Sequence, residues 1–339
     1  MKKVTNYILI NFIKSFNPIF FTLFFMVSII YFIKIAKITA IIKISFLELG
    51  ELYLYILPRI IIYTFPIVFF IAITLSLAKM SKENELGVIF SFGLSPKKIA
   101  TIFFYLSLLS STFLLIDAIF LVPISKQLYS NFIDVKKAEA KLNISAMEFG
   151  QKFSNWLVFI NKSEKQNSFE DIIMYSKEKN KDNFVIAKKA SVDNSKGTLK
   201  LKLNNGKAFI IEPKSIKQTD YKTMIVYNSK NMEIVGKKGV LSYWLKALKD
   251  RGRAKDFATF ILVSLFPLVL FLLSVSFGIF NPRYETPNIY GYIFATIVSY
   301  YILMYYTISL NPLVSIILIP LVSLIVSFLV FKKKVLSRY

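Results

Sequence analysis

The segment FATFILVSLFPLVLFLLSVSFGIF occupies residues 257–280 and contains no charged residue. An α-helix needs about 20 apolar residues to cross roughly 30 Å of hydrocarbon. Its one internal proline, Pro267, is compatible with this reading because neighbouring helices can satisfy the backbone groups that it frees. The segment therefore predicts a transmembrane helix.

Similar apolar runs occur on both sides of this segment. The chain has 339 residues, of which 55% are hydrophobic and 16% aromatic, and its mean hydropathy is +0.54. A soluble domain of this composition would expose large apolar patches. We therefore predict a membrane protein whose other five spans cover residues 17–36, 56–78, 99–121, 289–309 and 313–331. The first 16 residues are basic and amphipathic, and no signal-peptide cleavage site follows the apolar run, so they predict an interfacial helix that leads into the first span.

The short loops differ in charge between the two sides of the membrane. Lys and Arg gather before the first span and after the second, fourth and sixth, and six crossings put all of these on one side: Lys2, Lys3, Lys14, Lys79, Lys82, Lys97, Lys98, Arg283, Lys332, Lys333, Lys334 and Arg338. On the other side, Lys37 and Lys43 are offset by Glu48 and Glu51. Because cytoplasmic loops carry the excess of Lys and Arg, both termini are predicted in the cytoplasm.

This orientation divides the chain into three parts. Residues 1–122 form an N-terminal transmembrane half, residues 123–256 an inserted domain outside the cytoplasm, and residues 257–339 a C-terminal transmembrane half. The inserted domain begins with a polar helical stretch at about 124–142. Alternating strands are predicted after it at 156–161, 171–176, 184–190, 198–203, 207–212, 224–228 and 232–235. Asn205-Gly206 is a hairpin signal, and strands of this kind are typical of a sandwich, jelly roll or barrel.

Composition excludes several kinds of chemistry. The chain has no Cys and no His, which removes disulfides, zinc–thiolate sites and His-based acid–base catalysis, so we expect no catalytic residues and no metal site. The net charge of +23 is not gathered in a nucleic-acid-binding motif, and a basic surface beside anionic lipid is the better interpretation. No G-x-x-x-x-G-K-[ST] motif occurs, so we expect no bound cofactor, and any ATP-driven work would need a partner that binds ATP.

The loop SKENELGVIFSFGLSPKKIA, residues 81–100, predicts a short helix on the membrane surface. Ser81 is a candidate N-cap, Glu83 and Glu85 suit the first turn, and Gly93 suits a C-cap. Ser95-Pro96 then starts the next span. Two interpretations remain open at this point: a capped connector, or a coupling helix, at about 81–93, that docks into a cytosolic partner.

The order of three spans, an external β domain and three spans resembles the YjgP/YjgQ family, the paired LptF- and LptG-type permeases of the lipopolysaccharide-export ABC transporter. The resemblance covers the whole chain. Its motifs are Glu85-Leu86 with Gly93 eight residues after the Glu, then Leu94-Ser95, the preceding Leu57-Pro58 and Phe65-Pro66, and an N-P-R turn at Asn281-Pro282-Arg283. Two positions depart from the family pattern: Asn6 precedes Tyr7 where the family has Arg, and Glu285-Thr286 replace small residues.

The resemblance implies an inner-membrane transporter subunit that is not itself an enzyme and that takes part in outer-membrane biogenesis. Its partners would be a paralogous permease, a cytosolic ABC ATPase dimer, a periplasmic jelly-roll component and lipopolysaccharide. The inserted domain would be a periplasmic β-jelly roll. Residues implied in coupling to the ATPase are Glu83, Glu85, Leu86, Phe90 and Gly93.

Basic residues near the outer ends of the first two spans are candidates for substrate binding. Lys34 and Lys37 lie one turn apart, and Arg59 lies near the start of the second span. They can either snorkel to lipid head groups or face a cavity and pair with lipid A phosphates. Asp117, near the outer end of the third span, either pairs with a Lys or has a proton or substrate role.

Other classes of protein remain as alternatives. These are a permease of another ABC-type lipid or lipoprotein exporter, a membrane enzyme acting on lipids, and a membrane-anchored partner-binding protein. The enzyme would need convergent polar residues at one membrane depth, of which the spans offer little beyond Asp117. A macrolide-exporter-type permease would carry its external domain after the first span. The sequence does not distinguish an LptF-type from an LptG-type subunit.

Overall fold

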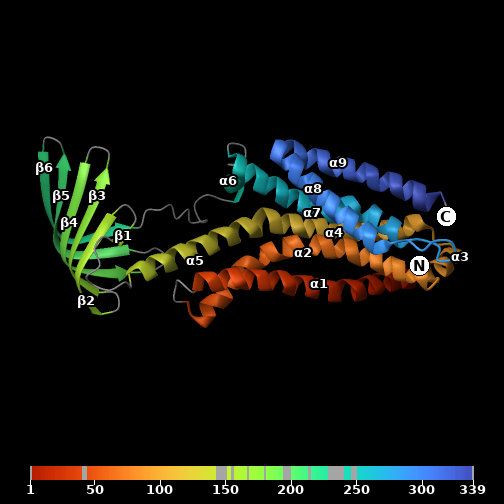
Figure 1. The fold of residues 1–339 in the computed structure, drawn as a ribbon, viewed down its shortest axis with the longest axis horizontal. Coiled ribbons are helices and arrows are strands. Elements are labelled where there is room, and N and C mark those ends of the chain that lie inside the picture. The colour runs from red at the N-terminus through yellow and green to blue at the C-terminus, as the bar shows by residue number, and fades with distance from the viewer. Residues whose placement is uncertain are drawn as a thin grey trace. The chain divides into compact units, whose positions relative to one another are not determined.

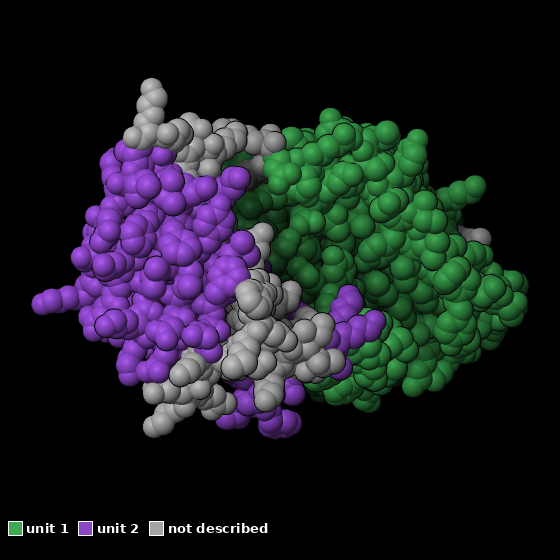
Figure 2. Space-filling view, turned by 60° about the vertical axis from the view of Figure 1, so that its left-hand side comes forward, with its two compact units in different colours: residues 1–33, 55–126, 238–339 green, residues 34–54, 127–237 purple. Residues whose placement is uncertain are grey.

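The computed structural model describes residues 2–39, 44–142, 151–153, 156–165, 168–178, 181–193, 200–212, 215–227, 240–245 and 250–337. The chain forms two compact units (Figure 2). The helical unit comprises residues 1–33, 55–126 and 238–339, and the sheet unit comprises residues 34–54 and 127–237. Both groups of three spans thus contribute to a single helical unit.

Within the described residues, six helical segments are long and apolar enough to cross a membrane, which confirms the six predicted spans. The helices are α1 (Lys2–Thr39), α2 (Phe46–Lys82), α3 (Glu85–Ser91), α4 (Pro96–Ile116), α5 (Val122–Leu142), α6 (Val240–Leu245), α7 (Arg251–Gly278), α8 (Ile289–Leu310) and α9 (Pro312–Phe331), with π-helical turns η1 (Asp117–Leu121) and η4 (Lys332–Leu336) (Figure 1). In the helical unit, α7 packs against α4, α8 and α9.

Several helices extend well beyond the apolar runs that predicted them. Helix α1 continues through the predicted interfacial segment without a break. Helix α2 begins ten residues before the predicted span because Ser45 and Glu48 form a capping box. In it, the Ser45 N–H donates to Glu48 Oε2 at 2.8 Å, and the Glu48 N–H donates to Ser45 Oγ at 3.4 Å.

Buried serines mark the close approach of helices in this unit. Ser264 Oγ on α7 lies 3.1 Å from the Leu114 carbonyl oxygen of α4, and Ser327 Oγ on α9 lies 3.0 Å from that of Val269 on α7. Small side chains let helix backbones approach and can hydrogen-bond across the interface in lipid. The helices around α7 are therefore held by both packing and hydrogen bonds.

The described strands form one antiparallel sheet in sequential order from β1 to β6. The strands are β1 (Gln151–Phe153), β2 (Trp156–Lys165), β3 (Ser168–Glu178), β4 (Lys181–Asp193), β5 (Lys200–Glu212) and β6 (Ser215–Tyr227). The predicted alternation holds in β5, where Leu201 and Leu203 are buried and Lys202 is exposed. The segment 232–235, predicted as a strand, lies outside the described residues. The predicted class, an α+β membrane protein with a strand domain between the third and fourth spans, is confirmed.

The predicted hairpin at Asn205-Gly206 is wrong. Strand β5 runs through both residues and pairs with β4 on one side and β6 on the other. Asn205 adopts a left-handed conformation with φ 53°, which Asn tolerates inside a kinked strand as well as in a turn. A Cβ on Gly206 would collide with the backbone carbonyl oxygen of Ile186 and with the hydroxyl of Tyr221, so glycine is required by both neighbouring strands.

Candidate functional site

Helix α3 is a separate helix between α2 and α4, and its C-terminus is capped as the sequence predicted. Gly93 has φ 83°, its N–H donates to the Phe90 carbonyl at 2.9 Å, and the Leu94 N–H donates to the Ile89 carbonyl at 3.3 Å. These bonds form a Schellman motif in which Phe92 is the C-cap residue and Gly93 is the left-handed residue after it, and this confirms that Gly93 closes the helix. Ser95 then precedes Pro96, the first residue of α4, as expected.

Ser81, in contrast, is not the N-cap of this helix. The residue before α3 is Asn84, which has φ 60°. Ser81 is buried in the last turn of α2, where its Oγ donates to the Gly278 carbonyl at 2.7 Å and accepts from the Phe280 N–H at 3.3 Å. The prediction fails because the end of α7 offers Ser81 backbone groups that have no partner inside their own helix.

The inner face of α3 is part of the core of the helical unit. Leu86 is 2% exposed, and Ile89 is also buried. Both belong to one apolar cluster with Ile8 and Phe12 of α1, and Phe90 packs partly buried against it. Figure 1 places α3 at the end of the helical unit where the N- and C-terminal ends of the chain lie, which we call the terminal end.

The outer face of α3 carries two apolar side chains, Val88 and Phe92, which are 54% and 83% exposed. They are four residues apart and so lie on one side of the helix and its cap. We call these two residues the α3 knob. Sequence reasoning missed them because an apolar residue in an apolar segment looks like core. The available signal was the helical spacing, which separates them from Leu86 and Ile89.

The two predicted acidic residues of this region lie in different environments. Glu83 is exposed and 4.0 Å from Lys79 Nζ, a weak surface pair. Glu85 accepts a hydrogen bond from the Tyr7 hydroxyl at 2.7 Å on Oε1. Its Oε2 is buried and has no hydrogen-bond partner among the described residues. The Glu85 carboxylate is therefore engaged with α1.

The predicted substrate-binding residues lie away from α3, near the last turn of α1 and in the first half of α2. Lys34 and Lys37 are exposed on α1, one turn apart, and belong to the sheet unit. Arg59 of α2 is half-buried and belongs to the helical unit. The structure thus places the two lysines on a shared stretch of helix, and Arg59 in a separate unit.

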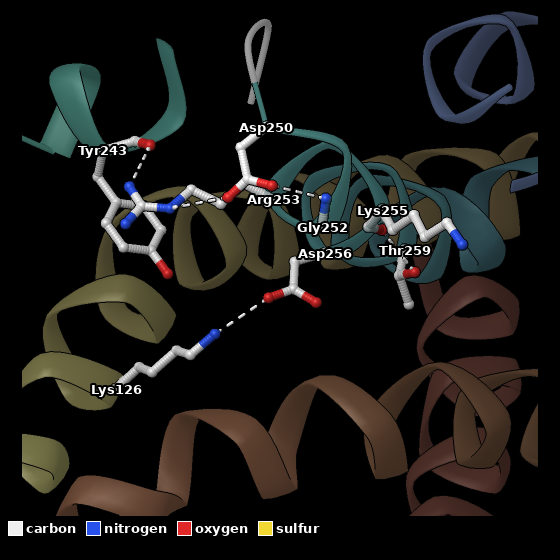
Figure 3. A network of polar contacts seen from close by, with 8 residues as sticks. All are labelled: Lys126, Tyr243, Asp250, Gly252, Arg253, Lys255, Asp256 and Thr259. Carbon is white, nitrogen blue, oxygen red and sulfur yellow. Dashed lines mark hydrogen bonds and ion pairs between the residues drawn. The ribbon is translucent and has the colours of Figure 1, made fainter. Parts of the chain in front are cut away.

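A polar network that sequence reasoning missed surrounds the start of α7 (Figure 3). Lys126 Nζ of α5 lies 3.0 Å from Asp256 Oδ2 of α7. Asp250 caps α7 by accepting from the Gly252 N–H at 2.9 Å, and the Arg253 guanidinium lies 4.8 Å from the centre of the Tyr243 ring of α6. The network ties α5 and α6 to α7. Its sequence signal was the charged run at 250–256, directly before the fourth span.

Asp117 lies in the π-helical turn η1 between α4 and α5. It is 2% exposed, and neither carboxylate oxygen has a hydrogen-bond partner among the described residues. The π turn itself is supported by Trp244, whose indole N–H donates to the Ile119 carbonyl at 2.9 Å. The predicted pairing of Asp117 with a lysine does not occur in the described part of the chain.

Comparison with known proteins assigns the chain. The family model of the lipopolysaccharide export system permeases LptF/LptG matches residues 6–333. The match covers all six spans and the inserted sheet, and it confirms the resemblance seen in the coupling loop and the N-P-R turn. A search of curated proteins finds no match. This chain belongs to the LptF/LptG family of lipopolysaccharide export permeases.

Proposed function

We propose that this chain is one of two paired permease subunits that extract lipopolysaccharide from the bacterial inner membrane and pass it to a periplasmic β-jelly-roll component. ATP is hydrolysed by a separate cytosolic dimer that grips α3. The observation that carries this proposal is the α3 knob, an exposed apolar pair on a helix whose other face is anchored in the core. An aromatic side chain exposed outside the hydrocarbon fits a partner groove.

Charge supports an orientation in which the terminal end faces the cytoplasm. Ile8, Leu86 and Val335 share one cluster there, so α1, α3 and η4 lie together. The lysines around it belong to the loops with most positive charge, as cytoplasmic loops do: Lys79, Lys82, Lys97, Lys98, Lys332, Lys333 and Lys334. In this orientation α3 is within reach of a cytosolic ATPase, and the sheet unit lies in the periplasm.

Within this function, Lys34, Lys37 and Arg59 are the residues that we propose to bind the lipid phosphates. The two lysines are exposed near the periplasmic end of α1, where the head group of an outer-leaflet lipid lies. An ammonium–phosphate pair is much stronger in a partly dry site than in water.

The sheet unit supplies the surface for transfer. Strands β1 and β6 are the edges of the described sheet, and β6 exposes Ile216 and Ile225. An open strand edge can pair with the edge of another sheet by β-augmentation. We therefore assign β6 to contact the next jelly-roll component in the path of the lipid.

The α3 knob is tested by truncation of Phe92. Phe92→Ser is compared with Phe46→Ser, since Phe46 is 88% exposed at the far end of α2. Loss of a central aromatic anchor costs about 2 kcal/mol or more in an interface, which is roughly 30-fold in affinity. We expect Phe92→Ser to lose most of the co-purifying ATPase and Phe46→Ser to retain it. Full retention of the ATPase by Phe92→Ser would remove α3 as the docking element.

A further inference from the structure

We propose that Tyr7 is a positioning residue for the coupling step: its hydroxyl fastens Glu85 to α1, so that α3 and α1 move as one body when the ATPase moves α3. This inference rests on the proposed function, because it needs a motor that acts on α3. It gives Glu85 a contact inside the chain, in addition to the coupling role that the family resemblance implies for this residue.

The contact itself is short and charge-assisted. The Tyr7 hydroxyl oxygen lies 2.7 Å from Glu85 Oε1 and joins residues 78 positions apart in the chain. A hydroxyl that donates to a carboxylate makes one of the stronger classes of hydrogen bond. Since Glu85 Oε2 is buried, neither carboxylate oxygen is free on the outer face of α3. The side chain is thus placed to hold α1.

Packing next to this bond joins the same two helices. Ile8 follows Tyr7 and is fully buried, and Phe12 lies one turn further along α1. Both are in the cluster that buries Leu86 and Ile89 of α3. An apolar contact alone permits sliding and rotation, because it has no direction. The Tyr7–Glu85 bond supplies the direction and fixes how α3 is rotated on α1.

Helix α1 is able to pass a displacement onward. It is one continuous helix from Lys2 to Thr39, with Tyr7 near its first turn and Lys34 and Lys37 near its last. Its middle exposes large apolar side chains, including Phe21, Phe25 and Ile29, so it is weakly held by the rest of the chain. A push on α3 is therefore passed to α1, whose other end carries the proposed phosphate-binding lysines.

The test uses the whole transporter, reconstituted with its partner permease and ATPase in vesicles that contain lipopolysaccharide. Tyr7→Phe removes one hydroxyl and keeps the ring. Tyr290→Phe is the matched control, because Tyr290 is 73% exposed at the start of α8, on the same side of the membrane in the proposed orientation. We expect Tyr7→Phe to retain the ATPase and to lower the lipid exported per ATP hydrolysed by about tenfold, the effect of losing one hydrogen bond to a charged group.

A double-mutant cycle isolates the contact. Glu85→Ala removes the acceptor, and we expect Tyr7→Phe combined with Glu85→Ala to export no worse than Glu85→Ala alone. Glu85→Gln keeps an acceptor oxygen for Tyr7 and should export better than Glu85→Ala. Additive losses in the double variant, or a Tyr7→Phe equal to Tyr290→Phe, would overturn the inference while leaving the proposed function intact. Absence of any ATPase from the wild-type complex would instead refute the proposed function.

Discussion

The contact between α2 and α7 can be tested with one methyl group. Gly278 ends α7, and a Cβ there would lie 2.5 Å from Leu77 Cβ and 3.0 Å from the Thr74 carbonyl oxygen of α2. The Thr74 oxygen belongs to the backbone of α2, and Leu77 Cβ is bonded directly to that backbone. Neither atom can therefore move away by rotation of a side chain. Gly278→Ala must push the helices apart and stretch the hydrogen bond from Ser81. Overpacking of this kind costs about 1–3 kcal/mol.

Gly87→Ala is the control, because its expected effect on stability has the opposite sign. Gly87 lies in α3 with nothing within 4 Å of an added Cβ, and alanine is favoured over glycine in a helix by about 0.5–1 kcal/mol. The assay is thermal unfolding of the purified chain in detergent, followed by the fluorescence of Trp244, which is buried in the helical unit, in a Trp156→Phe background that removes the tryptophan of the sheet unit. At about 2–4 °C per kcal/mol, the unfolding midpoint of Gly278→Ala should be roughly 2–12 °C lower than that of the wild type, and that of Gly87→Ala should be no lower. Equal midpoints for Gly278→Ala and wild type would refute the close approach of α2 and α7.

Two further predictions concern polar groups in each unit. Asp117→Leu should raise the unfolding midpoint in the same assay, because a buried carboxyl without a partner costs about 1–3 kcal/mol. A lower midpoint would contradict this, since it would reveal a partner for Asp117 that the described residues do not supply. Tyr221→Phe should cost about 0.5–1.5 kcal/mol, since it loses the bond from the Tyr221 hydroxyl to the Ile186 carbonyl. Tyr221→Ala should cost more, because it also removes the ring that covers Gly206. Hydrogen exchange of β4, β5 and β6 measures the stability lost in each variant. Equal protection in Tyr221→Phe and Tyr221→Ala would contradict this role of the ring.

The spans could be predicted because hydrocarbon imposes a length and a composition. The ends of the helices could not, because hydropathy reports only the segment that needs lipid. Ser45 and Glu48 start α2 through a local capping box outside the apolar run. In the same way, α4, η1 and α5 follow one another without a gap from Pro96 to Leu142, although hydropathy falls after Leu121.

Asn205-Gly206 illustrates a local signal with two structural solutions. The pair is favoured wherever the backbone needs a positive φ, and both a hairpin turn and a kinked strand satisfy that need. Here β5 continues through the pair, and Ile186 of β4 and Tyr221 of β6 both lie against Gly206. These two residues are 20 and 15 positions away along the chain, beyond the reach of a local motif.

The coupling loop shows the same division between local and distant causes. Gly93 could be identified from the sequence because a Schellman motif is completed by residues of the same turn. The roles of Leu86 and Glu85 depend on α1, and nothing near position 85 indicates that Tyr7 is its partner. Leu86, which the sequence grouped with the coupling residues, is buried inside the helical unit, and its role in coupling stays a prediction.

A helix as short as α3 does not hold its shape in water by itself, because helix nucleation is costly and isolated helices under about 12–15 residues are marginal. Its conformation therefore depends on what surrounds it: the cluster around Leu86, the cap at Gly93 and the bond from Tyr7. Helix α1 provides the bond from Tyr7 and part of the cluster around Leu86. A partner that grips Phe92 thus cannot move α3 alone without breaking contacts that keep it helical. The first turns of α1, predicted as a helix resting on the bilayer, support α3 directly, and in the proposed function a force applied to α3 would therefore pass to a transmembrane helix.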